Sequence, residues 1–128
     1  MTRRVSSGAP WESVVGYSRA VAAGDHIWVT GCTSIVDGDV VNEGDPFAQT
    51  QQAIRNVAWA LEQLDATLDD VVRTRIYVTD IAHWAQVGRA HGEVFGDVRP
   101  AATMVQVVAL IEPELLVEIE ADAVVSRP

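Results

Sequence analysis

The chain has 128 residues, of which 48% are hydrophobic, and a formal net charge of −9 with nine basic residues, all arginine. This length suits a single domain spanning 1–128, and so much apolar surface excludes an intrinsically disordered chain. The acidic balance opposes nucleic-acid binding, because phosphate contacts need clustered positive charge. No signal segment and no apolar run of about 18 residues is present, so we expect a cytoplasmic protein that does not enter the membrane.

Cysteine and histidine usage argues against metal chemistry. Cys32 is the only cysteine, which excludes an internal disulfide and a zinc–thiolate cluster. His26, His83 and His91 do not have the spacing of metal ligands, so we predict no metal site and no cofactor. Cys32 is interpreted as a small buried thiol, with a nucleophile as the alternative.

The first half of the chain predicts a β-hairpin followed by a helix. Residues 17–22 and 26–32 form two strands around the turn Ala23–Asp25, and a loop follows at 37–39. Asp45 can cap a helix that begins at Pro46 and continues to about residue 64. Spacing of three and four residues predicts that its buried face holds Thr50, Ile54, Val57, Leu61 and Leu64.

The second half predicts a strand, a helix and two more strands. In the strand at 70–80, one face carries Val72, Thr74, Ile76 and Val78, and the other carries Arg73, Arg75 and Tyr77. Asp80 can cap a helix at 81–95, whose buried side we expect to hold Ile81, Trp84, Val87, His91 and Val94. Gly88 and Gly92 would let another backbone approach closely. Residues 103–110 and 115–125 form the last strands.

The last predicted strand alternates strictly between apolar and acidic residues. Glu118, Glu120 and Asp122 share one face, and the opposite face holds Val117, Ile119, Ala121, Ala123 and Val125. The element order is ββαβαββ, which predicts an α+β fold with a mixed sheet and two helices packed on one face. The other face mixes charged and aromatic side chains, as at contacts between copies of one protein, where arginines can pair with the carboxylates.

Several segments together carry a family resemblance. They read GYSRAVAAGDHIWVTG, QTQQAIRNVAWALEQL, DVVRTRIYVTDI, VFGDVRPAATMVQV and VEIEADAVV. The chain resembles the RidA/YjgF family of reactive-imine deaminases along nearly its whole length. The resemblance implies a chorismate-mutase-type fold and a homotrimer with small-molecule clefts between subunits.

The resemblance also implies site residues. Tyr17 matches the tyrosine of the family's cleft, and Thr30, before Gly31, stands where a serine or threonine is usual. Glu118 matches the glutamate that holds the reacting water, so it is the predicted catalytic residue. Ala102 and Thr103 occupy the substrate-binding segment. The chain departs from the family where Gly88 replaces an asparagine and Met104 replaces a frequent cysteine.

The largest departure is at Ala102. Active deaminases of the family read Pro-Ala-Arg, and this arginine binds the substrate's carboxylate, whereas here the triplet is Pro100-Ala101-Ala102. Alanine offers neither charge nor donors. Arg19 lies two residues beyond Tyr17 on the same predicted strand face, so it is either a relocated clamp for an anionic ligand or part of a structural ion pair.

Three functions remain open from the sequence. The first is an enzyme acting on an imine, enamine or related carbonyl metabolite, with Glu118 positioning water. The second is a trimer that binds a metabolite without turnover. The third, RNA cleavage or translation inhibition, is opposed by the acidic charge. Trp11 and Glu12 precede Tyr17 and are placed to overhang the predicted cleft, with anchoring of the N-terminal arm as the alternative for Trp11.

Ala102 generates a prediction about activity. We expect the rate on 2-aminoacrylate-derived imines to lie far below that of relatives with the arginine. Loss of a charged clamp costs about 2–5 kcal/mol, which is roughly 30-fold to several-thousand-fold in rate. A side-by-side rate measurement checks this, and equal rates would show that another residue supplies the clamp.

Overall fold

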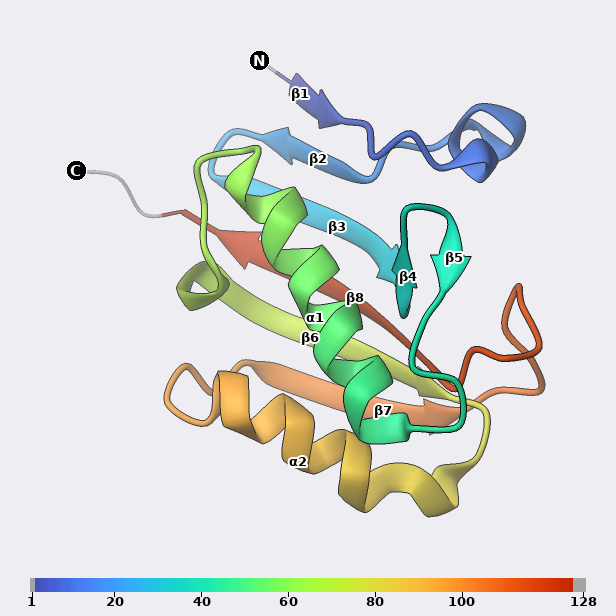
Figure 1. Cartoon of the computed structure of the whole chain (residues 1–128). Coiled ribbons are helices and arrows are strands. Elements are labelled where there is room, and N and C mark those ends of the chain that lie inside the picture. The colour runs from blue at the N-terminus through green and yellow to red at the C-terminus, as the bar shows by residue number, and fades with distance from the viewer. Residues whose placement is uncertain (1, 126–128) are drawn as a thin grey trace.

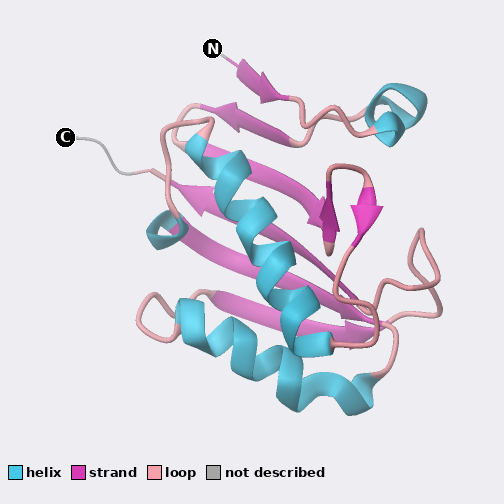
Figure 2. Cartoon of the chain, in the orientation of Figure 1, coloured by secondary structure: helices cyan, strands magenta, loops and turns pink. Residues whose placement is uncertain are grey.

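The computed structural model describes residues 2–125, which form a six-stranded mixed sheet with two helices on one face (Figures 1 and 2). The strand order is β1-β2-β3-β8-β6-β7. The bounds are β1 Thr2–Val5, β2 Ala20–Ala23, β3 His26–Cys32, α1 Pro46–Glu62, β6 Val71–Val78, α2 Trp84–Phe95, β7 Ala101–Gln106 and β8 Val117–Val124. From β2 onward, these elements confirm the predicted ββαβαββ order and the α+β class.

Three strands were not predicted. β1 pairs with β2 at the sheet edge, while β4 (Ile35–Val36) and β5 (Asp39–Val40) form a separate two-stranded sheet. The turn between β4 and β5 holds Asp37 and Gly38 at positive φ values of 51° and 86°. Strands of two to four residues are too short to show an alternation in the sequence.

Helix α1 begins and packs as predicted. The Asp45 carboxylate accepts a hydrogen bond from the Ala48 N–H at 3.0 Å, which caps the first turn. All five residues predicted for the buried face are buried. Gln49 is also buried, although no periodic pattern marks it. Its side chain donates to the carbonyls of Asn42 and Glu114 and accepts from the Leu116 N–H. This amide ties α1 to the chain that enters β8.

The predicted buried side of the second helix is partly wrong. Val87 is buried, together with Ala90 and Phe95, whereas Ile81, Trp84 and Val94 are 45%, 62% and 38% exposed. The segment begins with a 3₁₀ turn, η3 (Ile81–His83), capped by Asp80. The different period of the 3₁₀ turn accounts for Ile81. Trp84 and Val94 lie within α2, whose buried face is formed by Val87, Ala90 and Phe95 and is therefore rotated from the predicted one.

Two further expectations for α2 have different outcomes. His91 is partly buried, and its Nε2 lies 2.9 Å from the Thr74 hydroxyl oxygen. A Cβ added at Gly88 or Gly92 would meet no atom within 4 Å, so the predicted close backbone approach is wrong.

A register shift in β6 explains the error at Val72. Thr74, Ile76 and Val78 are buried as predicted, but Val72 is 47% exposed. The pairing with β8 shifts between Val71 and Arg73, so Val71 takes the buried position. A bulge moves the following residues to the opposite face, which alternation alone does not reveal.

The alternation of β8 is confirmed, and the topology explains it. β8 lies between β3 and β6, so its Val117, Ile119, Ala121 and Ala123 side chains are buried under the helices. On the opposite face, which we call the open face, Arg75 lies 3.6 Å from Glu120 and 3.4 Å from Asp122. The Tyr77 hydroxyl donates to Glu120 at 2.7 Å. The charged face is thus already partly paired within one chain.

The strand before β8 is shorter than predicted. β7 pairs in parallel with β6 over Ala101–Gln106 only, and the chain then leaves the sheet, with Val108 fully exposed. Between residues 2 and 125, no helix has the length and apolar character needed to cross a membrane.

Candidate active site

A β-bulge shapes the candidate site. Val29 pairs with Ala121 and Cys32 with Ile119, so Thr30 and Gly31 together stand opposite one residue of β8. The bulge brings the Gly31 Cα against the Glu118 side chain. A Cβ at residue 31 would lie 1.9 Å from Glu118 Oε2 and 2.8 Å from its carboxyl carbon, so any larger residue here would have to displace the Glu118 side chain.

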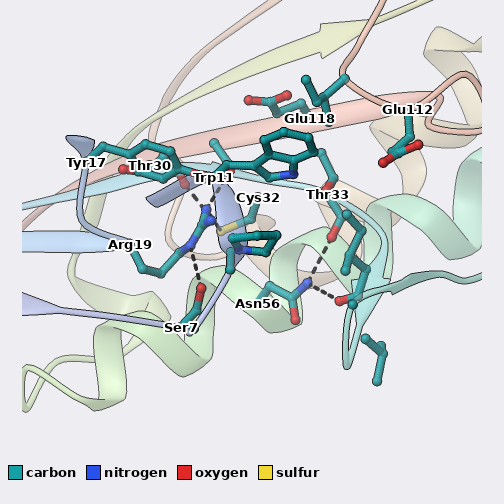
Figure 3. Close-up of a pocket in the computed structure, with 18 of the residues that line it drawn as sticks. Ser7, Trp11, Tyr17, Arg19, Thr30, Cys32, Thr33, Asn56, Glu112 and Glu118 are labelled. Carbon is teal, nitrogen blue, oxygen red and sulfur yellow. Dashed lines mark hydrogen bonds between the residues drawn. The ribbon is translucent and has the colours of Figure 1, made fainter. Parts of the chain in front are cut away.

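The bulge borders a cavity of about 990 Å³. It lies among the N-terminal arm (residues 7–17), the end of β3, the β4–β5 hairpin, α1 and the loop before β8 (Figure 3). Its lining includes Ser7, Trp11, Tyr17, Arg19, Thr30, Gly31, Cys32, Asp37, Gln52, Asn56, Trp59, Glu112 and Glu118.

The Glu118 carboxylate is the group in this cavity best suited to accept a proton. It accepts no hydrogen bond from any residue in the described range. Burial raises the pKa of Glu118 above its ordinary value, the nearby charge of Glu120 raises it further, and Arg19 opposes the shift. A partly buried carboxylate with a raised pKa and free oxygens can act as a general base toward water. A smaller cavity, of about 310 Å³, reaches Glu118 from the side of Tyr77 and Glu120.

Arg19 both faces the cavity and forms a structural ion pair, which are the two alternatives that the sequence left open. It lines the cavity, and its Nη1 donates to the Gly31 carbonyl at 2.8 Å. Its Nε lies 3.9 Å from Glu12 Oε2, and the guanidinium carbon lies 5.6 Å from the centre of the Tyr17 ring. Nη2 makes no hydrogen bond with residues 2–125. The carboxylate that pairs with Arg19 is therefore Glu12, and none of the acidic residues of β8 pairs with it.

Glu12 anchors the N-terminal arm. It is buried in the single π-helical turn η1 (Glu12–Gly16), and it accepts hydrogen bonds from the Ser7 N–H at 3.1 Å and from the Ser7 hydroxyl. Burial by itself would raise the pKa of Glu12, but the hydrogen bonds from Ser7 and Ser6 and the charge of Arg19 outweigh it and leave this pKa lowered. Glu12 is thus the anchor, while Trp11, 41% exposed, lines the cavity.

Tyr17, Thr30 and Cys32 also reach the cavity. The Thr30 hydroxyl donates to the Ser18 carbonyl at 2.7 Å, which positions its oxygen beside the bulge. Burial raises the pKa of the Cys32 thiol to about 11. Its sulfur lies 3.3 Å from the Thr30 carbonyl oxygen, to which the thiol donates. A thiol that stays protonated at neutral pH is a poor nucleophile, which favours the structural interpretation of Cys32.

Ala102 and Thr103 do not line this cavity in the single chain. Both lie on the exposed edge strand β7, which β6 separates from β8. Ala102 pairs with Thr74 and shares the helix-covered side, whereas Thr103 pairs with Arg75 and shares the open face. A role for these residues in the cleft requires a second copy of the chain.

Sequence reasoning missed the wall that α1 contributes. Asn56 donates to the carbonyls of Thr33 and Ile35 at 2.9 and 3.0 Å, which holds the loop after β3 and the start of β4 against the helix. Trp59 lies one turn further along α1. Both lie outside the apolar repeat of α1, so periodicity assigned them no role. Among the described residues, no cluster of three or more His, Cys, Asp or Glu side chains is arranged to hold a metal ion.

Comparison with known proteins places this site in a family. The model of the endoribonuclease L-PSP family matches residues 7–125. The chain belongs to this family, also called the YjgF/RidA family. The crystal structure of Rv2704 from Mycobacterium tuberculosis, a member of the YjgF/YER057c/UK114 family, is 54% identical and superposes with a TM-score of 0.89 over 98% of this chain and 100% of that one.

Two curated relatives extend the comparison. Protein SCO2049 of Streptomyces coelicolor is 40% identical over 121 residues, which are 94% of this chain and 90% of that protein. The 3-aminoacrylate deaminase RutC of Acinetobacter baylyi is 32% identical over 104 residues, which are 80% of this chain and 82% of that protein. The predicted family resemblance is therefore confirmed.

The contact between Gly31 and Glu118 generates a prediction about stability. Gly31→Ala should destabilise the protein by about 1–3 kcal/mol, because the added methyl group forces the carboxylate or the bulge to move. Chemical denaturation measures this change. Adding Glu118→Ala to Gly31→Ala should recover part of the loss, since the clashing side chain is then gone.

Gly92→Ala on α2 is the matched control, because a Cβ there enters open space. It should leave the stability unchanged or raise it by up to about 1 kcal/mol. A Gly31→Ala protein as stable as the parent would contradict the close contact.

Proposed function

We propose that this chain is a RidA-type hydrolase that acts on the C=N bond of a small imine or on its enamine tautomer, with Glu118 as the general base. The observation that carries the proposal is the Glu118 carboxylate, which borders the cavity without a hydrogen-bond partner in the described chain and has a raised pKa. The name of the Acinetobacter relative, a 3-aminoacrylate deaminase, supports the same chemistry.

The proposed reaction consumes one water and releases one ammonia. The water oxygen adds to the imine carbon while its proton passes to Glu118. Glu118 returns the proton to the nitrogen, which gives a carbinolamine with one hydroxyl and one amino group on the same carbon. Glu118 then takes the hydroxyl proton and passes it to the nitrogen, so the C–N bond breaks, the C=O bond forms and neutral ammonia leaves. A raised pKa suits both steps, because the group must accept and return the proton near neutral pH.

A non-catalytic binding trimer is the second candidate. The absence of an arginine at Ala102 and the pairing of Arg19 with Glu12 favour it, since both weaken the grip on an anionic substrate. RNA is a poor ligand for this cavity, because one guanidinium and three carboxylates line it.

A homotrimer is part of the proposal. The open face and the edge strand next to it expose Trp28 (47%) and Val105 (43%), and His26 stacks on Trp28 with ring centres 5.8 Å apart. Exposed aromatic and apolar side chains on a mixed face are typical of contacts between copies. Such a contact is also the means by which Ala102 and Thr103 of one copy would approach the cleft of another.

The proposed role of Glu118 predicts the effect of Glu118→Gln. The amide keeps the shape but accepts no proton, so turnover of an imine generated in the assay should fall about 10²- to 10⁴-fold. Ammonia release measures the rate, and circular dichroism confirms the fold. Glu93→Gln, on the exposed surface of α2, is the control and should keep the parent rate. Unchanged turnover in Glu118→Gln would rule out this role, and no turnover in the parent on any imine would favour the binding trimer.

The proposed trimer predicts the effect of a charge on β7. Val105→Glu should lower the mass measured by light scattering at micromolar concentration from three chains to one, because an unpaired carboxylate would be buried in the contact. Val94→Glu on α2, at a similar exposure of 38%, should remain trimeric. A monomeric parent protein would remove the basis for clefts between subunits.

A further inference from the structure

We propose that the cavity takes a cationic ligand with an aromatic or aliphatic body and no carboxylate, namely a protonated imine during turnover or an amine in simple binding. This ligand class rests on the proposed function of the same site. It differs from the carboxylate-bearing imines that a Pro-Ala-Arg triplet would select.

The side chains that line the cavity carry more negative than positive charge. Glu118, Glu112 and Asp37 line the cavity, and Arg19 is the only arginine among the lining residues. The charge of Arg19 is offset by the buried Glu12, whose Oε2 lies 3.9 Å from its Nε. A carboxylate that enters therefore meets an excess of negative charge in a partly dry space, whereas a cation meets attraction.

Two tryptophan side chains in the lining can attract a cation. Trp11 and Trp59 line the cavity from the N-terminal arm and from α1, with 41% and 43% of their surfaces exposed. A cation placed within about 6 Å of an indole face is attracted by the ring's quadrupole. Ile35 and Val36 of the β4–β5 hairpin add an aliphatic wall. Tryptophan faces and carboxylates together suit an organic ammonium or iminium group.

The cavity is large enough for a ligand with a sizeable apolar body. Its volume of about 990 Å³ lies at the upper end of the roughly 300–1,000 Å³ that is usual for small-molecule sites. A three-carbon imino acid would leave most of that space as water. In the view of Figure 3, Glu118 and Asn56 appear on opposite sides of Trp11, and all three line the cavity. The lining therefore offers contacts to the body of a ligand whose charged group lies at Glu118.

The chemistry is compatible with a cation at Glu118. A protonated imine is more electrophilic than the neutral form, and the carboxylate can pair with its N–H while water adds to the carbon. The reaction balances as C=NH₂⁺ plus water giving C=O plus ammonium. Both water protons pass through Glu118 to the nitrogen, the first when water adds to the carbon and the second as the C=O bond forms. The nitrogen leaves with the C–N electron pair and ends as ammonium.

A comparison of three probes of similar shape tests the ligand class. The probes are 2-phenylethylammonium, 3-phenylpropanoate and 3-phenyl-1-propanol, titrated into the parent protein by calorimetry at low salt. We expect the ammonium to bind at least about tenfold more tightly than the carboxylate, with the alcohol between them. Carboxylate binding as tight as ammonium binding, or no binding of any probe at millimolar concentration, would overturn the proposal.

Variants locate the binding. Trp59→Ala and Glu118→Gln should each weaken ammonium binding at least about threefold, whereas Trp84→Ala, at a tryptophan on α2 outside the cavity and 62% exposed, should not. An equal loss in Trp84→Ala would argue against this cavity. Binding is measured without turnover, so the two proposals fail separately. If the protein hydrolyses carboxylated imines but does not prefer the ammonium probe, the ligand class is wrong and the proposed hydrolysis stands. An ammonium preference without turnover of any imine would overturn only the proposed hydrolysis.

Discussion

The contact between the Gly31 backbone and the Glu118 side chain is the constraint on which the rest of the site depends. A Cβ at residue 31 would overlap the carboxylate, and this closeness arises because the β3 bulge sets two residues against one of β8. β8 can supply the carboxylate only because it lies between β3 and β6, with its apolar side chains buried under the helices. The fold thus holds a partly desolvated acid at the border of a cavity, where its protonated form is favoured more than in water.

A second set of contacts decides the charge of that cavity. Glu12, Ser7 and Arg19 connect the N-terminal arm to the Gly31 carbonyl, so one network closes the cavity wall and neutralises its only arginine. Arg19 therefore stabilises the N-terminal arm and has little capacity left to bind a ligand. Its Nε already contacts Ser7 and Glu12, and its Nη1 already donates to the Gly31 carbonyl. The excess of carboxylates in the lining follows from this pairing together with the alanine at residue 102.

The cavity has two independent electrostatic features, namely a proton-accepting carboxylate and a lining without an unpaired arginine. Glu118 supplies a carboxylate with a raised pKa, while residue 102 is alanine and the one arginine of the lining pairs with Glu12. The indoles of Trp11 and Trp59, in a cavity of about 990 Å³, offer a different means of holding a ligand. Amine chemistry and carboxylate recognition are physically independent, since the first needs a base near the reacting carbon and the second needs a fixed cation several ångströms away.

The sequence alone determined the features that depend on local periodicity and on caps: the ββαβαββ order, the Asp45 cap, the buried face of α1 and the alternation of β8. The family segments led to Tyr17, Thr30 and Glu118, which do lie around one cavity. Only the tertiary structure decided that Arg19 pairs with Glu12 and that Asn56 and Trp59 form one wall of the cavity. It also decided that Val72 and Trp84 are exposed. Finally, it placed Ala102 and Thr103 away from the cavity of their own chain. The physical reason is that bulges, 3₁₀ turns and contacts between distant parts of the chain decide which face a side chain occupies and which charge lies next to it. None of these three produces a periodic pattern in the sequence.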